Sequence, residues 1–209
     1  MPFDLDAWVV GSASPSPIVR AGAAVLRHRA HDVPRALIGS PALMRLVDVM
    51  VETMRSAPGV GLAAPQIGVP LRVFVAEDTY ERMQHVSEEA RIDRGRTPLP
   101  LTVLVNPTVS AAAGGGRATF FEGCLSVPGY AALVRRATTV AVAGLDARGA
   151  PVARTFEGWP ARIMQHEMDH LDGTLYVDRM ISRSLASDAE MARLAALPVA
   201  DVLRELVDP

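Results

Sequence analysis

The chain has 209 residues and a mass of 22.3 kDa, which suits one domain because a domain takes roughly 150 residues. Hydrophobic residues make up 49% of the chain and charged residues 21%, so the composition is globular and excludes a wholly disordered protein. The net charge of −2 gives no reason to expect a nucleic-acid partner or an anionic membrane.

The lack of lysine and the presence of a single cysteine limit the chemistry that the chain can carry out. All 21 residues in the lysine-plus-arginine count are arginines, and the lack of lysine excludes Schiff-base, pyridoxal-phosphate and P-loop lysine chemistry. Cys124 is the one cysteine, so no disulfide forms within the chain, which fits a reducing compartment. The sequence has no apolar run near the ~20 residues of a membrane span and does not start like a signal or transit peptide. We therefore predict a cytoplasmic protein.

The order of elements predicts an α+β fold. Residues 1–16 are mixed in character and are expected to form a flexible lead-in. A helix is expected to start at Pro41 with Ser40 as its N-cap, because apolar residues then recur at helical spacing. The alternation over 71–76 predicts a strand, and the charged stretch 81–98 predicts a loop or short exposed helix inserted into the domain.

Strands are expected in the middle of the chain. The apolar run 101–105 predicts a strand closed by Asn106 and the proline after it. Three glycines over 114–116 predict a turn between two hairpin strands. Alternation over 138–145, followed by turn residues over 146–149, predicts another hairpin.

Two helices are expected towards the C-terminus. The first has Pro160 in its first turn and Gly173 just past its end. The second starts at a capping box formed by Ser187 and Glu190, and Pro198 interrupts it.

The first of these helices carries a metal-binding pattern, His166-Glu167-Met168-Asp169-His170. The two imidazoles lie one turn apart on one helix face, where both can bind one ion. Glu167 projects beside that face and can reach a bound water, which is the arrangement of metal-dependent hydrolases. The alternative is a pair of surface histidines on an amphipathic helix.

The residues leave the third ligand open. In one zinc-protease class a third histidine follows, and Gly173 matches its glycine, but the ligand position holds Tyr176. In another class a later glutamate completes the site, and here only Glu190 and Glu205 follow. Cys124 is the remaining soft ligand, although a lone cysteine is otherwise an inert core residue.

A run of small residues over 59–66 ends in Gln66. Small residues let backbone approach closely, and an amide donor near a metal site can stabilise a developing oxyanion. The alternative is a structural turn after the first helix.

Three segments read GVGLAAPQ over 59–66, EGCLS over 122–126 and QHEMDHLDG over 165–173. In order and spacing they resemble the peptide deformylase family. The resemblance extends from about residue 17 to residue 183. The stretch 158–163 is similar to the branch that includes organellar deformylases.

The resemblance implies a fold and a domain organisation. The fold would be α+β, with mixed antiparallel sheets wrapped around a central metal-binding helix and with a C-terminal helix. Residues 1–16 would be the lead-in, 17–183 the catalytic domain and 184–209 a helical tail.

The resemblance also implies the catalytic machinery. The metal ligands would be Cys124, His166 and His170. The ion would be one Fe²⁺ per chain, with Zn²⁺, Ni²⁺ or Co²⁺ able to substitute. Metal-bound water would be the nucleophile and Glu167 the general acid/base, while Gln66 and the backbone N–H of Leu125 would stabilise the oxyanion.

The implied reaction removes the formyl group from the N-terminal formyl-methionine of new polypeptides and releases formate. The implied partners are nascent polypeptides at the ribosome exit, without direct nucleic-acid or membrane binding. A homodimer is possible through the tail.

The methionine pocket is expected to be lined or flanked by Val60, Gly61, Phe120, Trp159, Arg162 and Ile163. Side chains alternate along a strand, so only one of Phe120 and Phe121 can face that pocket. Many relatives have arginine where this chain has Ala131, and that arginine can contact the peptide beyond methionine. Arg135 or Arg136 is a candidate to compensate for its loss.

Two other functions are carried as alternatives. A metallopeptidase would use the same helix, have a third ligand other than Cys124, and cleave internal amides. A non-catalytic binding module would have a damaged metal or acid/base residue, and no such damage is present in the sequence.

Overall fold

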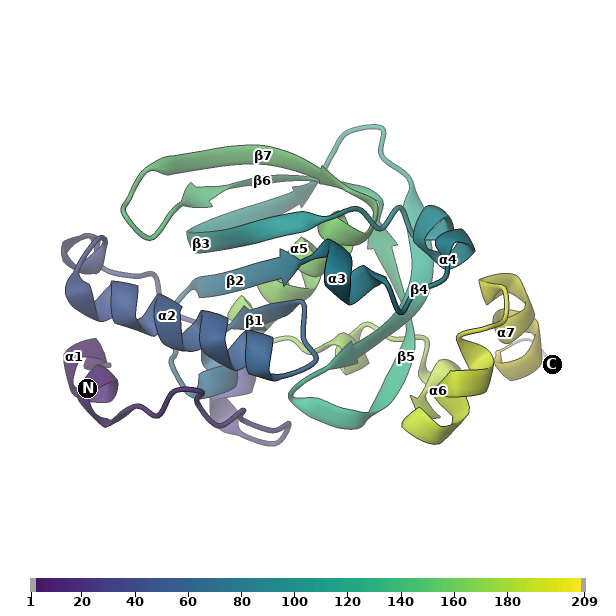
Figure 1. The fold of residues 1–209 in the computed structure, drawn as a ribbon, viewed down its shortest axis with the longest axis horizontal. Coiled ribbons are helices and arrows are strands. Elements are labelled where there is room, and N and C mark those ends of the chain that lie inside the picture. Colours follow the sequence, from purple (N-terminus) through teal and green to yellow (C-terminus); the bar gives the residue numbers. More distant parts are fainter. Residues whose placement is uncertain (1–2, 208–209) are drawn as a thin grey trace.

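Helix α5 (Gly158–Leu171) lies at the centre of the fold, with antiparallel sheets around it (Figure 1). The structure is a computed structural model, and it describes residues 3–207. The predicted α+β architecture is confirmed. Helices α1 (Leu5–Gly11) and α7 (Val199–Leu206) lie at opposite ends of the molecule (Figure 1).

The strands form two sheets in the described residues. The five-stranded sheet has the order β1 (Gly61–Ala63), β2 (Val73–Asp78), β3 (Leu99–Ala111), β6 (Thr139–Leu145) and β7 (Pro151–Glu157). The three-stranded sheet has the order β4 (Arg117–Cys124), β5 (Val127–Ala137) and β8 (Ala186–Ser187). Short 3-10 helices lie at Ala24–Leu26, Arg35–Leu37, Ala64–Ile67, Tyr176–Asp178 and Ser182–Ser184.

Strand β2 of the five-stranded sheet is buried on both faces. Along β2, Val73 and Val75 pack in the cluster that contains helix α2 (Pro41–Ser56), while Phe74 and Ala76 pack in the cluster that contains α5. Successive side chains of a strand point to opposite faces, so this sheet separates the two helices. Each fully buried large apolar side chain contributes about 1.5–3 kcal/mol to stability.

Helix α2 forms where the sequence predicted it. The Ser40 hydroxyl accepts a hydrogen bond from the N–H of Leu43, 3.2 Å away, and Pro41 occupies the first turn. The apolar residues of its buried face include Leu43, Met50 and Met54. A capped helix with such a face is stabilised mainly by its packing on the sheet.

The start of the chain differs from the flexible lead-in expected for 1–16. Helix α1 (Leu5–Gly11) is capped by Asp4, whose side chain accepts a hydrogen bond from Ala7 at 3.0 Å. Leu5 is buried in the cluster of α2. Phe3, Trp8 and Val9 pack against the same cluster. A few apolar residues in a mixed segment are a weak sequence pattern, and the neighbouring helix gives them a place to pack.

Strand β3 does not end at Asn106 as predicted. It runs on to Ala111 because a bulge between Val105 and Thr108 absorbs the irregular residues. Asn106 has a φ of 50°, and its side chain exchanges hydrogen bonds of 2.7 and 3.0 Å with the backbone of Val33. A side chain that pairs with a distant backbone offsets the cost of the unusual φ.

The glycine turn over 114–116 does not join a hairpin either. It leads from β3 in one sheet to β4 in the other. The predicted hairpin after residue 138 is confirmed, because β6 pairs with β7. In its turn the Asp146 carboxylate accepts hydrogen bonds from the N–H groups of Arg148 and Ala150.

The charged insertion forms two short helices, α3 (Tyr80–Met83) and α4 (Glu88–Asp93). The insertion packs on the rest of the domain. Met83 is buried, and Arg96 makes a bidentate ion pair of 2.7 and 3.0 Å with buried Asp78 of β2. Arg96 also lies over the ring of Trp159, 5.5 Å from its centroid.

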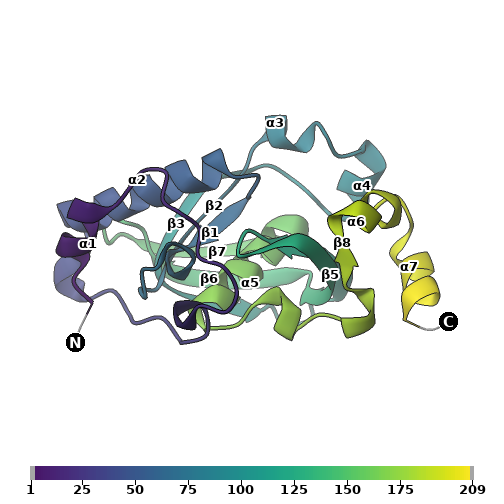
Figure 2. The ribbon, with the colours of Figure 1, turned by 90° about the horizontal axis from the view of Figure 1, so that it is seen from below.

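The tail forms α6 (Asp188–Leu194) and α7 (Val199–Leu206), which pack beside β5 and β8 (Figure 2). Leu194 and Val202 are buried against Leu133. The helix starts after Ser187 as predicted, but the Ser187 side chain makes no capping hydrogen bond. Among the residues described, no helix has the length and apolar character needed to cross a bilayer.

The start of α5 packs against Gly95 of the charged insertion, and this contact predicts that alanine costs more stability at Gly158 than at Gly114. Gly158 and Gly114 both have a positive φ, at 59° and 76°, but only at Gly158 would a Cβ overlap the carbonyl of Gly95. We expect Gly158→Ala to lower the free energy of unfolding by about 2–4 kcal/mol and Gly114→Ala by about 1 kcal/mol. Urea denaturation of both variants measures this, and equal losses would contradict the packing of Gly158 on Gly95.

Candidate metal centre

Helix α5 presents His166 and His170 on one face. Their rings lie 5.0 Å apart between centroids and meet edge to face at 76°. The helix runs without interruption to Leu171, and Gly173 follows with a φ of 73°. The predicted helix boundaries and the predicted one-turn spacing of the histidines are therefore both observed.

Cys124 comes from the end of β4. The register between β4 and β5 shifts between Gly123 and Cys124, and the chain then turns back. The Cys124 Sγ lies 3.3 Å from the His170 Nε2. One ligand atom each from Cys124, His166 and His170 lies within 4.8 Å of the others.

This donor set fits a divalent transition-metal ion. One thiolate and two imidazoles suit a borderline or soft ion, and three protein ligands leave a coordination position open. Beside them, the Glu167 Oε2 is buried and has no hydrogen-bond partner among the described residues. A buried carboxylate oxygen without a partner costs free energy, and a water or substrate group near an ion at the three donors would relieve that cost.

A buried carboxylate holds the first histidine in place. The Glu122 Oε2 lies 3.0 Å from the His166 Nδ1, and the Glu122 carboxylate also accepts hydrogen bonds of 2.9 and 2.8 Å from Arg136. Although burial opposes ionisation, Arg136 and His166 hold the pKa of Glu122 far below its ordinary value. With its Nδ1 engaged, His166 keeps its Nε2 for the ion.

Arg136 joins this carboxylate to α5. It also forms a 2.5 Å ion pair with Asp169, which in turn pairs with Arg179 at 2.7 Å. The guanidinium of Arg136 is therefore buried in ion pairs and is not available to contact a peptide. It cannot replace the arginine that many relatives have at the position of Ala131, contrary to one expectation. Ala131 itself is buried in the sheet between β4 and β8.

Arg162 is also an internal residue. Its guanidinium donates to the Glu122 carboxylate at 2.6 Å and to the carbonyls of Val134 and Ala118 at 3.0 and 2.8 Å. It reaches the cavity wall, but its hydrogen bonds show that it positions Glu122 and the neighbouring strands.

Gln66 is oriented by hydrogen bonds on both sides of its amide. Its Oε1 accepts from the N–H of Ala63 at 2.9 Å, and its Nε2 donates to the Ser126 hydroxyl at 3.2 Å. The Nε2 also lies 3.5 Å from the Cys124 Sγ. Because the Ala63 N–H can only donate, the amide must point its NH₂ group towards the metal centre.

The glycines over 59–61 let the backbone approach two site residues. A Cβ at Gly61 would overlap the Glu167 carboxylate, and a Cβ at Gly59 would come within 2.7 Å of the Leu125 side chain. The segment 59–66 is thus strand β1 and a 3-10 helix rather than a simple turn. Close approach, one of the two predictions for this segment, is observed.

Glu167 is a buried carboxyl group with a raised pKa. It is 4% exposed, and burial, together with the nearby charges of Glu122 and Asp169, raises its pKa to about 7. A cation bound beside Glu167 would lower that pKa, because it favours the ionised carboxylate.

A cavity of about 640 Å³ opens over the centre. The predicted pocket residues that line it are Val60, Gly61, Trp159, Arg162 and Ile163. Phe120 is not among its lining residues, whereas Phe121 is. The ring of Phe120 packs edge-on against that of Trp159, with centroids 6.4 Å apart. Phe120 therefore flanks the cavity through this lining residue, and its part in a methionine pocket stays a prediction.

Two contributors were missed by sequence reasoning. Tyr176, considered only as a failed ligand position, stacks its ring on His166 at 6.4 Å and donates its hydroxyl to the Tyr130 carbonyl at 2.9 Å. Burial, with the charges of Cys124 and Asp188, raises the pKa of Tyr176 to about 12. Asp188 lines the cavity from the tail, and no motif in the sequence could place it there.

Comparisons with known proteins agree on one family. A family model described as polypeptide deformylase matches residues 15–185. Peptide deformylase 1 of Streptomyces coelicolor is 54% identical over 185 residues, which cover 88% of this chain and 82% of that protein. The mitochondrial peptide deformylase of Homo sapiens is 41% identical over 181 residues, with coverage of 86% and 74%.

Solved structures show the same likeness. A class I type b peptide deformylase from Acinetobacter baumannii, bound to Met-Ala-Ser, is 34% identical with a TM-score of 0.70, covering 81% of this chain and 99% of that one. A peptide deformylase from Synechococcus elongatus in complex with actinonin is 36% identical with a TM-score of 0.68, covering 82% and 83%.

The network predicts that Glu122 supports metal binding. We expect Glu122→Gln to weaken the affinity for Zn²⁺ by about 10- to 100-fold, because the orientation of His166 depends on that carboxylate. The free energy of unfolding should fall by about 3 kcal/mol, because buried Arg162 loses its counter-charge and buried Arg136 keeps only Asp169. Chelator competition and urea denaturation measure the two effects. The matched control is Glu190→Gln, an exposed ion-pair residue, and equal metal affinity in both variants would contradict the role.

Proposed function

The chain belongs to the polypeptide deformylase family, and from that membership we propose that it removes the formyl group from the N-terminal formyl-methionine of newly made polypeptides and releases formate. The resemblance seen in the sequence is confirmed, and relatives include mitochondrial and chloroplastic forms. The chain is accordingly an enzyme of a metal-dependent hydrolase family.

One observation carries the proposal. The ligand atoms of Cys124, His166 and His170 lie within 4.8 Å of one another, and Cys124 and His166 line the cavity together with Glu167 and Gln66. A formyl group is small and terminal, so a chain end reaches donors inside a cavity with less steric hindrance than an internal amide does.

The proposed ion is Fe²⁺, one per chain, with Zn²⁺, Ni²⁺ or Co²⁺ able to substitute, since a thiolate and two imidazoles accept several such ions. When bound, it would polarise the formyl oxygen and lower the pKa of a coordinated water towards neutrality. Cys124, His166 and His170 would hold it.

Glu167 is the proposed general acid/base. Its carboxylate lies against Gly61, and its Oε2 has no partner among the described residues. It would take a proton from the attacking water and pass it to the departing amine, which requires a group that changes protonation during one turnover.

Gln66 and the backbone N–H of Leu125 are the proposed oxyanion donors. The Ala63 N–H fixes the Gln66 amide, so no reorientation is needed when negative charge develops on the formyl oxygen. One such preorganised donor is worth about 3 kcal/mol of transition-state stabilisation.

The methionine side chain would occupy the apolar part of the cavity. Val60, Phe121, Trp159 and Ile163 line it, and an apolar wall with few polar groups is typical of a site for an unbranched apolar side chain. The substrates would be nascent polypeptides, reached in the cytoplasm near the ribosome exit without direct contact to nucleic acid or membrane. A homodimer stays a prediction.

The metallopeptidase alternative loses its structural basis. It needs a third ligand other than Cys124, and the two candidate glutamates, Glu190 and Glu205, instead pair with Arg193 on the tail. The alternative of a non-catalytic binding module needs the loss of a metal ligand or of the acid/base residue. The chain keeps Cys124, His166, Glu167 and His170.

The test is formate release from a short formyl-methionyl peptide. The protein is purified without oxygen and reloaded separately with Fe²⁺, Ni²⁺ and Zn²⁺. We expect release with iron or nickel that a chelator abolishes. No release with any metal, despite one bound ion per chain, would overturn the proposed reaction.

If Glu167 is the general acid/base, its substitution should lower the rate of formate release without changing metal binding. Glu167→Gln keeps the shape of the side chain but cannot accept a proton, so the rate of formate release should fall at least about 100-fold while the metal content stays at one ion per chain. Glu89→Gln, on the exposed face of α4, is the control. Turnover that survives Glu167→Gln would refute the acid/base assignment.

A further inference from the structure

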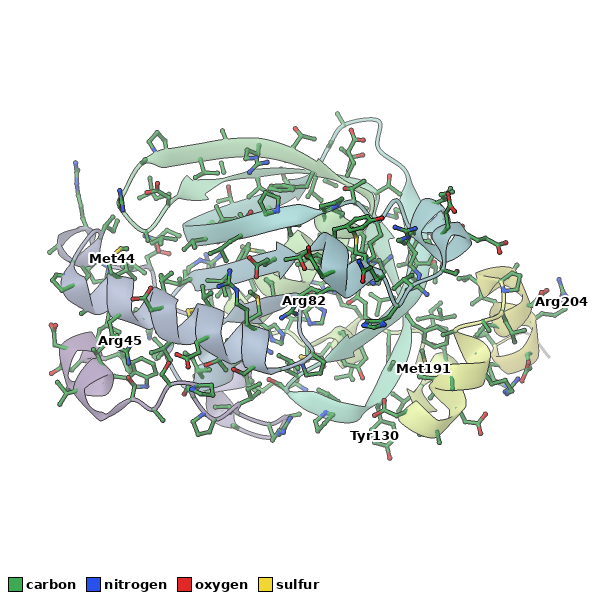
Figure 3. All side chains as sticks on the ribbon, in the orientation of Figure 1. Met44, Arg45, Arg82, Tyr130, Met191 and Arg204 are labelled. Carbon is green, nitrogen blue, oxygen red and sulfur yellow. The ribbon has the colours of Figure 1, made fainter. Side chains whose placement is uncertain are left out.

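The rim of the cavity carries a carboxylate that the proposed reaction does not use. Asp188 belongs to the tail, yet it lines the same cavity as Glu167. Tyr130, from β5, lines the cavity beside it and is 50% exposed. Figure 3 labels Tyr130, which projects outward next to α6.

The pairing of β8 with β5 fixes this carboxylate at the rim. Tyr130 is the register partner of Ser187, so Asp188 follows directly at the edge of the sheet. The Tyr130 carbonyl accepts the hydroxyl of Tyr176, whose ring stacks on His166. A short series of contacts therefore sets the position of the rim relative to the metal centre.

The tail cannot leave the rim without losing buried surface. Leu194 of α6 and Val202 of α7 are buried against Leu133 of β5, and Phe121, a wall of the cavity, packs in the same cluster. Asp188 is thus attached to a packed element and not to a loose end.

The other charged groups that line the cavity are engaged. Glu122 is paired with Arg136 and Arg162, and Arg20 donates to the carbonyl of Leu125. Glu167 lies at the metal centre. Among the described residues, Asp188 has no ion pair or hydrogen bond through its side chain, so its charge faces the space through which a bound chain must leave.

The two ends of the opening differ in charge. Arg20 lies on the side of the Leu125 turn, because its neighbours Val19 and Ala21 hydrogen-bond to Gln66 and Ser126. Asp188 and the Tyr130 ring lie on the side of β5 and the tail. A carboxylate next to an exposed aromatic ring favours a guanidinium or ammonium group, through an ion pair and a cation–π contact.

We propose that Asp188, together with Tyr130, selects substrates that carry lysine or arginine within the first few residues after formyl-methionine. This inference rests on the proposed deformylase function. With the formyl group at the metal centre, the following residues pass out of the cavity, and those that pass on the β5 side meet Asp188. A neutral or acidic residue there gains no such contact.

The experiment compares formyl-Met-Ala-Ser with peptides in which lysine, glutamine or glutamate stands at position 2, 3 or 4. For the wild-type protein, kcat/KM should be about two- to fivefold higher for lysine than for glutamine at one of these positions, the size expected of an exposed ion pair. Glutamate there should be slower than glutamine. The lysine preference should shrink when the salt concentration is raised, because salt screens exposed charges.

Matched variants assign the effect. Asp188→Asn should abolish the lysine preference, and Asp188→Arg should reverse it in favour of glutamate. Glu190→Gln, which removes an acid of the same helix outside the cavity lining, should retain the preference.

The outcomes separate the two proposals. Equal kcat/KM for the lysine, glutamine and glutamate peptides, or a lysine preference that persists in Asp188→Asn, would overturn the role of Asp188 and leave the deformylase function intact. No formate from any formyl peptide would overturn the proposed function and this inference with it.

Discussion

The buried carboxylate of Glu122 is the interaction on which the site depends. One of its oxygens pairs with His166, and two arginines surround it. One of these arginines, Arg136, also pairs with Asp169, which lies on the same helix as His166 and His170. Strand β4 and helix α5 are thereby fixed relative to each other at the place where Cys124 must meet His166 and His170. Arginine suits this task because its planar fork serves two carboxylates at once. A buried network of this kind is costly to break, because each partner left behind is a buried charge without compensation.

The sequence predicted the residues of the centre better than their surroundings. The one-turn spacing of the histidines and the position of Glu167 follow from helix geometry, and they needed no tertiary information. Three features depend on partners that are distant in the sequence. They are the bulge at Asn106, the place of Phe121 rather than Phe120 in the cavity lining, and the burial of Arg136. Strand alternation showed that only one of the two phenylalanines could face the cavity, but the register of β4 against β5 decides which one does. The tail gave no motif, since its contribution at Asp188 arises only when β8 pairs with β5.

The cavity is lined by several segments that are separate in the sequence, and its lining near the candidate metal ligands differs from its lining at the rim. Near the candidate metal ligands, glycines let the backbone approach Glu167 and Leu125, and the Gln66 amide is held by Ala63. The rim is made by β5 and by a tail helix, and Phe121 of the cavity wall packs in the same cluster as that tail. In the proposed reaction, the buried network would position the reacting groups, and the side chains at the rim would select among peptides.

The most direct test of the account is whether Cys124 binds the ion. The protein loaded with one Co²⁺ per chain should show the near-ultraviolet charge-transfer absorption of a thiolate bound to cobalt, because a coordinating thiol is deprotonated. Cys124→Ser should lose this absorption and hold the ion more weakly, while the two histidines still bind it. An ion bound one-to-one without thiolate absorption in the wild-type protein, or an unchanged spectrum in Cys124→Ser, would contradict the account.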